Sequence, residues 1–156
     1  LFLKSHKHIE FLWISDRLAM VIPLAASFVR LGNFFNSEII GKPSSSSLAV
    51  VFERVDRIPR HPAQLYEFIS YIFIFIILNL IYRKYRENTP KGLLISLFLI
   101  LLFMARFTIE FSKEIQSPFE ATLPLNMGQI LSLPFIIFGI VLLYISVTKN
   151  KKNIKN

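Results

Sequence analysis

The stretch "GLLISLFLILLFMARFTIEF", residues 92–111, decides the fold class of this chain. Its only charged residues are Arg106 and Glu110, near its C-terminal end. As a helix with a rise of about 1.5 Å per residue, it would span the roughly 30 Å hydrocarbon core of a bilayer. A helix that is apolar on all faces is buried in protein or in lipid. The stretch therefore predicts a membrane-spanning helix.

Three further stretches have a similar length and composition, at residues 11–31, 65–83 and 127–147. The whole chain is 53% hydrophobic and carries 16 Phe among 156 residues, which is more apolar than an average soluble domain. Four such runs favour a membrane protein over a soluble helical bundle. We therefore expect an all-α integral membrane protein, with one membrane domain over residues 1–156.

A polar segment, residues 32–64, separates the first two spans, and its prolines argue against a long helix. Two short strand-like pieces fit around "SLAVVFERV", residues 47–55. The tail, residues 148–156, is basic and is expected to be disordered. The polar segment is expected to be irregular and to face outward, as explained next.

Lysine and arginine gather in three stretches that share one side of a membrane if the four spans alternate. They are the N-terminus, the loop between the second and third spans, and the tail, with Lys4, Lys7, Arg83, Lys84, Arg86, Lys91, Lys149, Lys151, Lys152 and Lys155. Positive residues flank spans on the cytoplasmic side. We therefore expect a cytoplasmic C-terminus, with residues 32–64 and 112–126 on the outer side.

The net charge of +8 is explained by these flanks, and no basic stripe with interleaved aromatic residues indicates nucleic-acid binding. The chain has no Cys, which excludes disulfides, thiolate metal sites and a cysteine nucleophile from this chain. His61 and scattered carboxylates do not form a metal ligand set, so neither a metal nor a cofactor is expected. The start of the chain shows no signal-peptide pattern. The first residue is Leu rather than Met, so we expect an N-terminal part to be missing.

Uncommon polar side chains gather at the outward end of the four spans. They are Arg30, Asn33, Asn36, Glu38, His61, Gln64, Tyr66, Glu67, Arg106, Glu110, Asn126 and Gln129. Ionisable groups within a span are costly, so they usually face a bundle interior or a wet cavity. Two guanidinium groups suit the oxygens of a phosphate. The residues alone therefore indicate a phospholipid-binding cavity that opens to the outer leaflet.

Each signal has a simpler explanation when taken singly. Arg106 and Glu110 are four residues apart and can form a structural ion pair on one helix face. Arg30 can extend its side chain to the lipid headgroups, and His61 before a proline can fix a turn. Polar groups at helix ends can cap or join helices, as is possible for Gln64, Glu67 and Gln129.

Four blocks carry a resemblance to a known family. They are "RLGNFFNSEIIGKP" (30–43), "RHPAQLYE" (60–67), "ARFTIEFSK" (105–113) and "LNMGQILSLPFI" (125–136). In order and spacing they resemble the signature blocks of bacterial prolipoprotein diacylglyceryl transferases. The resemblance covers essentially residues 13–147.

That resemblance implies a seven-span enzyme of the bacterial cytoplasmic membrane, with its site at the outer leaflet and no cofactor. Such an enzyme moves the diacylglyceryl group of phosphatidylglycerol to the lipobox cysteine thiol of a prolipoprotein, the first step of lipoprotein maturation. The implied partners are phosphatidylglycerol, prolipoprotein signal peptides and membrane lipids. The absence of Cys fits, because the thiol comes from the substrate.

The resemblance also implies roles for residues of this chain. Arg30, Arg106 and Glu110 would be catalytic, with the arginines stabilising the departing phosphate. The implied substrate-binding residues are Asn33, Asn36, Glu38, Gly41, His61, Gln64, Tyr66, Glu67 and Gln129.

The chain departs from the family at Val29 and Ser37, where glycine is common. It also has no counterpart of about three earlier spans, which bring a histidine and a tyrosine to the site. Our hypothesis is that the chain is the C-terminal portion of the enzyme and is inactive or poorly folded alone. The alternatives are an inactive lipid-binding fragment and a small membrane transporter subunit, which could also hold intramembrane charges.

Overall fold

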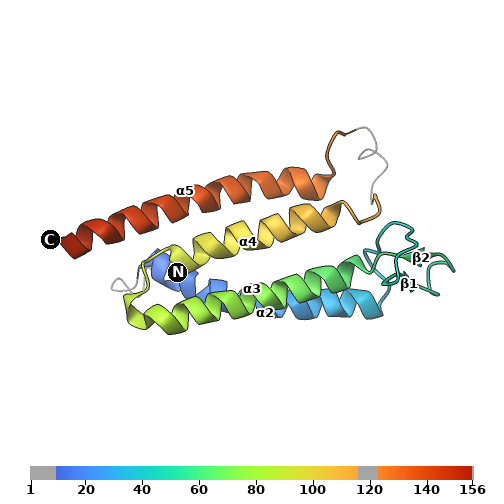
Figure 1. The fold of residues 1–156 in the computed structure, drawn as a ribbon, viewed down its shortest axis with the longest axis horizontal. Helices are drawn as coiled ribbons and strands as arrows, with labels where there is room; N and C mark the ends of the chain where they lie inside the picture. The colour runs from blue at the N-terminus through green and yellow to red at the C-terminus, as the bar shows by residue number, and fades with distance from the viewer. Residues whose placement is uncertain (1–9, 116–122, 156) are drawn as a thin grey trace.

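The computed structural model describes residues 10–115 and 123–155. Four long helices lie side by side (Figure 1). They are α2 (Phe11–Phe35), α3 (Ala63–Tyr85), α4 (Leu93–Glu110) and α5 (Met127–Lys155). A short 3-10 turn, η1 (Arg86–Asn88), follows α3. All four helices are long and apolar enough to cross a membrane, which confirms the prediction of four candidate spans.

The two ends of the bundle differ in structure. At one end α2 and α4 finish and α3 and α5 begin, and β1 (Val50–Val51) pairs antiparallel with β2 (Pro59–Arg60) (Figure 1). We call this the hairpin end. The opposite end holds the end of α5 and the turn between α3 and α4, and we call it the tail end. The polar residues expected at the outer ends of the spans thus come together at the hairpin end.

The helices pack in two pairs, and α4 joins one pair to the other. α2 packs along α3, α4 contacts both, and α5 packs mainly on α4. Buried side chains between α2, α3 and α4 form the core, namely Ala19, Tyr71, Ile74, Leu78, Leu94 and Phe98. Gly139 lets α5 approach α4 closely, because an added Cβ would lie 2.9 Å from Cγ1 of Ile100. Large apolar side chains remain exposed outside this core, as a lipid-facing surface requires.

A polar connection joins α2 to α4 at the tail end. The buried carboxylate of Asp16 accepts hydrogen bonds from the backbone N–H groups of Gly92, at 2.7 Å, and Ile95, at 2.9 Å. The first N–H groups of a helix have no partner within that helix, and its N-terminus favours a negative charge. A side chain of α2 therefore completes the first turn of α4.

Two boundaries differ from the sequence predictions. α2 continues to Phe35, so Asn33 lies in its last turn rather than in the polar segment. The expected disordered tail is wrong for residues 148–155, because α5 continues through Lys155. No glycine or proline follows Gly139 before that point, and lysine is a good helix former that suits a helix C-terminus. The N-terminal lysines and residues 116–122, used for the orientation prediction, lie outside the described residues.

Candidate functional site

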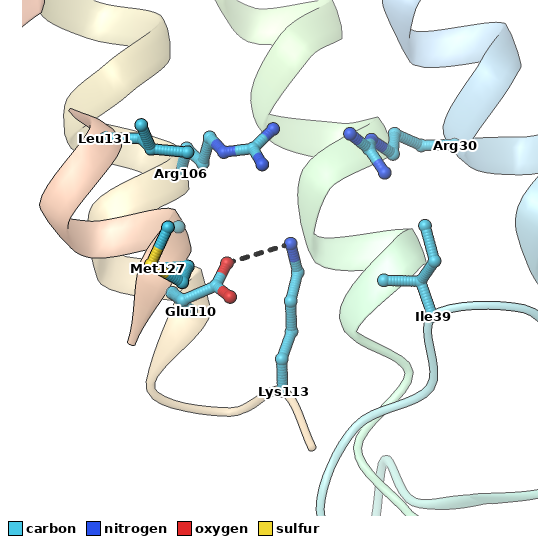
Figure 2. A pocket seen from close by; sticks show the side chains of 8 residues that line it. Arg30, Ile39, Arg106, Glu110, Lys113, Met127 and Leu131 are labelled. Carbon is cyan, nitrogen blue, oxygen red and sulfur yellow. Dashed lines mark hydrogen bonds and ion pairs between the residues drawn. The ribbon is translucent and has the colours of Figure 1, made fainter. Parts of the chain in front are cut away.

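Two arginines from different helices face one cavity at the hairpin end. Arg30 extends from α2 and Arg106 from α4, and they point toward one another from opposite sides (Figure 2). The cavity has a volume of about 170 Å³. Its lining consists of Arg30, Ile39, Arg106, Glu110, Lys113, Met127, Gly128 and Leu131. The three side chains that sequence reasoning assigned to catalysis therefore share one cavity.

Buried ion pairs of alternating sign surround this cavity. The carboxylate of Glu67, on α3, is fully buried, with its Oε2 3.2 Å from Nε of Arg30. Nζ of Lys113 donates to Oε1 of Glu67 at 2.9 Å and to Oε2 of Glu110 at 3.1 Å (Figure 2). Buried charges are costly unless they are paired, so each of these groups depends on its neighbours.

One positive charge is left over in this cluster, which holds three cations and two carboxylates. Arg106 lines the cavity and forms no ion pair with the described residues. The expected structural pair of Arg106 with Glu110 is replaced by the pair of Glu110 with Lys113. A cation in a water-poor cavity attracts an anion more strongly than one in bulk water. The cluster therefore suits a singly charged anion.

Lys113 was missed by sequence reasoning, although it lies three residues after Glu110 in a quoted block. Backbone pairing holds it in place, because Gly41 lies opposite it in an antiparallel bridge. The N–H of Lys42 donates to the carbonyl of Ser112 at 2.8 Å. A Cβ on Gly41 would lie 2.8 Å from that same carbonyl oxygen and 2.7 Å from Cβ of His61. The glycine is thus required for the two segments to meet, and their meeting positions Lys113.

Gly128 gives a first test of this geometry. A Cβ added there would lie 2.5 Å from Oε2 and 2.7 Å from Oε1 of Glu110, so the Gly128→Ala change should displace that carboxylate. We expect the transfer activity that the sequence resemblance implies to fall about 10- to 100-fold, because small misplacements of reacting groups are costly. The melting temperature should fall, because Glu110 is a partner of the buried Lys113, and disturbing a buried ion pair costs more than the helix preference of alanine contributes.

Gly32→Ala on α2 is the matched control for the helix effect on stability, because an added Cβ meets no atom within 4 Å. Thermal unfolding in detergent and a lipid-transfer assay provide the two readouts. Full activity in Gly128→Ala would show that the position of Glu110 is unimportant.

Several predicted binding residues lie in or around the turn that follows α2, beside the cavity. Nε2 of Gln64 donates to the backbone carbonyl of Glu38 at 2.6 Å, which joins α3 to this turn. Oε1 of Gln64 is buried and has no hydrogen-bond partner among the described residues. Nδ1 of His61 lies 3.2 Å from the hydroxyl of Tyr66. Asn33 lies in the last turn of α2, next to this segment.

The remaining predicted residues lie near the cavity but outside its lining, as far as the described residues show. Oε1 of Gln129 accepts from the backbone N–H of Asn126 at 3.1 Å and so caps the start of α5. The side chains of Asn36 and Glu38 are exposed at the end of α2. Their assignment to substrate binding stays a prediction.

Arg60 was also missed, although it begins one of the quoted blocks. It is buried and donates to both carboxylate oxygens of Asp56, and its Nη1 lies 2.5 Å from Oε2 of Glu114. These hydrogen bonds from Arg60 hold the pKa of Asp56 below its usual range. The same guanidinium reaches the carbonyl of Gly41 at 3.3 Å. Arg60 therefore fastens the polar segment to the residues after α4.

The chain is similar to known proteins along most of its length. Residues 1–145 match the family model described as prolipoprotein diacylglyceryl transferase. A phosphatidylglycerol–prolipoprotein diacylglyceryl transferase of Tolumonas auensis is 49% identical over 94% of this chain and 56% of its own length. Proteins with the same name from Bacteroides fragilis and Chloroherpeton thalassium are each 47% identical, over 84% and 86% of this chain.

This chain spans about half the length of these curated relatives, namely 56%, 47% and 50%. The matched residues include both arginines of the cavity and the segments that hold Lys113. A family match over more than nine-tenths of the chain leaves no doubt about its relationship. The chain belongs to the prolipoprotein diacylglyceryl transferase family.

Proposed function

We propose that this chain supplies the phosphate-binding half of an enzyme that transfers a diacylglyceryl group from phosphatidylglycerol to a prolipoprotein cysteine. The observation that carries the proposal is the pair of arginines facing one cavity, with one positive charge uncompensated. A phosphatidylglycerol headgroup carries one negative phosphodiester charge, which matches that excess. The names of the relatives at 47–49% identity supply the reaction.

In the proposed reaction, the thiol sulfur of the acceptor cysteine attacks the glycerol carbon that bears the phosphate. A carbon–sulfur bond forms, the carbon–oxygen bond breaks, and glycerol phosphate leaves with that bond's electron pair. Arg30 and Arg106 stabilise the charge that develops on the leaving group. Glu110 is the carboxylate that lines the cavity, and we assign it the thiol proton.

We also propose that the hairpin end faces the outer leaflet of a bacterial cytoplasmic membrane and that the C-terminus is cytoplasmic. The support is the basic loop at the tail end, with Arg83, Lys84, Arg86 and Lys91. The four helices would form part of a seven-span bundle, since the relatives are about twice as long as the matched region. Phospholipid would then reach the cavity from the outer leaflet.

A transfer assay tests the proposed function. The longest gene product that contains this chain is expressed in membranes and given labelled phosphatidylglycerol and a peptide with a lipobox cysteine. We expect the label to move to the peptide, with the mass increase of one diacylglyceryl group. The matched control peptide carries serine in place of the cysteine, and this chain alone is assayed in parallel.

The outcome distinguishes the transferase from the inactive lipid-binding alternative. Labelled phosphatidylglycerol that binds but does not modify the peptide would favour lipid binding alone. Modification of the serine peptide at the same rate would exclude thiol attack. No specific observation favours a transporter, because the relatives reported above carry transferase names.

A further inference from the structure

Ile39 lies between two hollows at the hairpin end. One is the cavity with the two arginines, and the other has a volume of about 280 Å³. The second hollow is lined by Ile39, Ile40, Glu114 and Ile115. Ile39 is the described residue that lines both, and Figure 2 shows it below Arg30 and opposite Lys113. A change in this side chain would therefore alter both spaces.

The backbone of Ile39 is strained. Its φ is 56°, in the left-handed region, which is unfavourable for a β-branched residue. Such strain persists where surrounding contacts determine the conformation, and it is concentrated at functional sites. Here the carbonyl of Glu38 accepts from Gln64 at 2.6 Å, and the carbonyl of Ile40 accepts from the N–H of Glu114 at 3.3 Å. These hydrogen bonds on both sides of Ile39 thus hold its backbone in an unfavourable conformation.

The lining of the second hollow suits an apolar group. Three of its four residues are isoleucines, and the carboxylate of Glu114 is paired with Arg60 at 2.5 Å. The volume lies below the roughly 300–1,000 Å³ of pockets for drug-sized ligands, so the hollow suits a smaller group, and one apolar side chain can enter it. The hollow therefore offers a small, charge-compensated surface.

The position of the hollow decides which part of a substrate it can receive. Its residues follow the C-terminal ends of α2 and α4, beyond the apolar helix surfaces. Acyl chains of a phospholipid bound at the arginines would lie along those helix surfaces, in the hydrocarbon. Beyond the phosphate, phosphatidylglycerol offers only a polar glycerol, which suits a lining of three isoleucines poorly. Of the two proposed substrates, the acceptor polypeptide is therefore the one that offers an apolar group to the hollow.

We propose that Ile39 is a specificity-determining residue, and that the hollow beside it receives one apolar side chain of the acceptor polypeptide. This inference rests on the proposed function. The two hollows lie on either side of one side chain, Ile39, and an extended peptide advances about 3.3 Å per residue. We therefore place the bound side chain within about three residues of the reacting cysteine. The size of the side chain at position 39 then sets which residues the peptide can carry there.

The test measures kcat/KM for a panel of acceptor peptides with the longest gene product that contains the chain. Each of the three positions on either side of the cysteine carries Ala, Leu or Phe in turn. Ile39→Gly removes the side chain that lines both hollows and relieves the backbone strain at this position. We expect the ratio of kcat/KM for the Phe peptide to kcat/KM for the Ala peptide to change about 10-fold at one peptide position only. A change of this size is usual when an apolar pocket gains or loses a few atoms.

Ser37→Gly is the matched control, because Ser37 has a φ of 58° in the same turn and does not line either hollow. It also relieves left-handed backbone strain and should leave every preference unchanged. Ile39→Val, which keeps the β-branched shape, should give a smaller change of about 3-fold at the same peptide position. This variant provides the test if Ile39→Gly fails to fold.

Each outcome bears on the inference separately from the proposed function. Wild-type protein without any lipid transfer contradicts the proposed function, and the inference falls with it. Normal transfer with unchanged preferences in both Ile39 variants contradicts the inference alone. An equal loss for all peptides in these variants also contradicts it, because that pattern indicates a structural role.

Discussion

Replacing Arg106 with alanine should lower kcat for lipid transfer about 10²- to 10³-fold. This is the usual cost of removing one preorganised donor that stabilises charge developing in a transition state. Arg106 lines the cavity and forms no ion pair with the described residues, so its charge is available to the leaving phosphate of the proposed reaction. Steady-state kinetics with phosphatidylglycerol in mixed micelles measure the effect.

The change in KM separates two roles of this guanidinium. If Arg106 acts on the leaving group, kcat falls more than lipid binding weakens, whereas a higher KM with unchanged kcat would indicate ground-state binding only. Arg57→Ala, at an exposed position of the polar segment, is the matched control and should leave both constants unchanged. We expect Arg30→Ala to behave like Arg106→Ala, with an added stability cost because it leaves Glu67 with one fewer partner.

Replacing Lys113 with alanine should destabilise the protein by about 3–5 kcal/mol, the usual cost of removing one partner of a buried ion pair. Lys113 lies between the buried carboxylates of Glu67 and Glu110, at 2.9 Å and 3.1 Å. Without the ammonium group, these two carboxylates face each other with less compensation. Thermal and denaturant unfolding in detergent measure the loss.

A second lysine of the chain provides the control for this prediction. Lys91 pairs with Glu10 at 2.6 Å, but both side chains are more than half exposed. Lys91→Ala should therefore cost about 0–1 kcal/mol. Lys113→Arg keeps the positive charge and should recover most of the stability. Equal losses for the two alanine variants would show that burial of the Lys113 pair has no energetic consequence.

The spans could be predicted from sequence because the bilayer restricts them strongly. A stretch such as residues 92–111 has few alternatives to a helix in lipid, since each backbone polar group must be satisfied internally. The helical tail could not be predicted, because its lysines favour helix while their density favours disorder. The short hairpin was only partly predicted, since β1 lies within residues 47–55 and β2 beyond them.

The charged residues of the candidate site could be predicted from sequence, but the ion pairs that they form could not. Charge position within a span identified Arg30 and Arg106, because an ionisable group there needs a partner or a cavity. Helical spacing paired Arg106 with Glu110, but Lys113 takes that carboxylate after the helix has ended. Its position depends on Gly41, 72 residues earlier in the chain, and no local pattern carries that information.

The hydrogen bonds of Asp16 at the tail end determine where the two arginines meet. Arg30 lies 14 residues beyond Asp16 on α2, and Arg106 lies 14 residues beyond Gly92 on α4. Both helices run from the tail end to the hairpin end. Each arginine therefore lies about 21 Å along its own helix from the hydrogen bond between Asp16 and Gly92. If α4 slid by one turn along α2, Arg106 would move by about 5.4 Å and lose its partner across the cavity. Asp16 thus sets the alignment of the proposed phosphate site from the opposite end of the bundle.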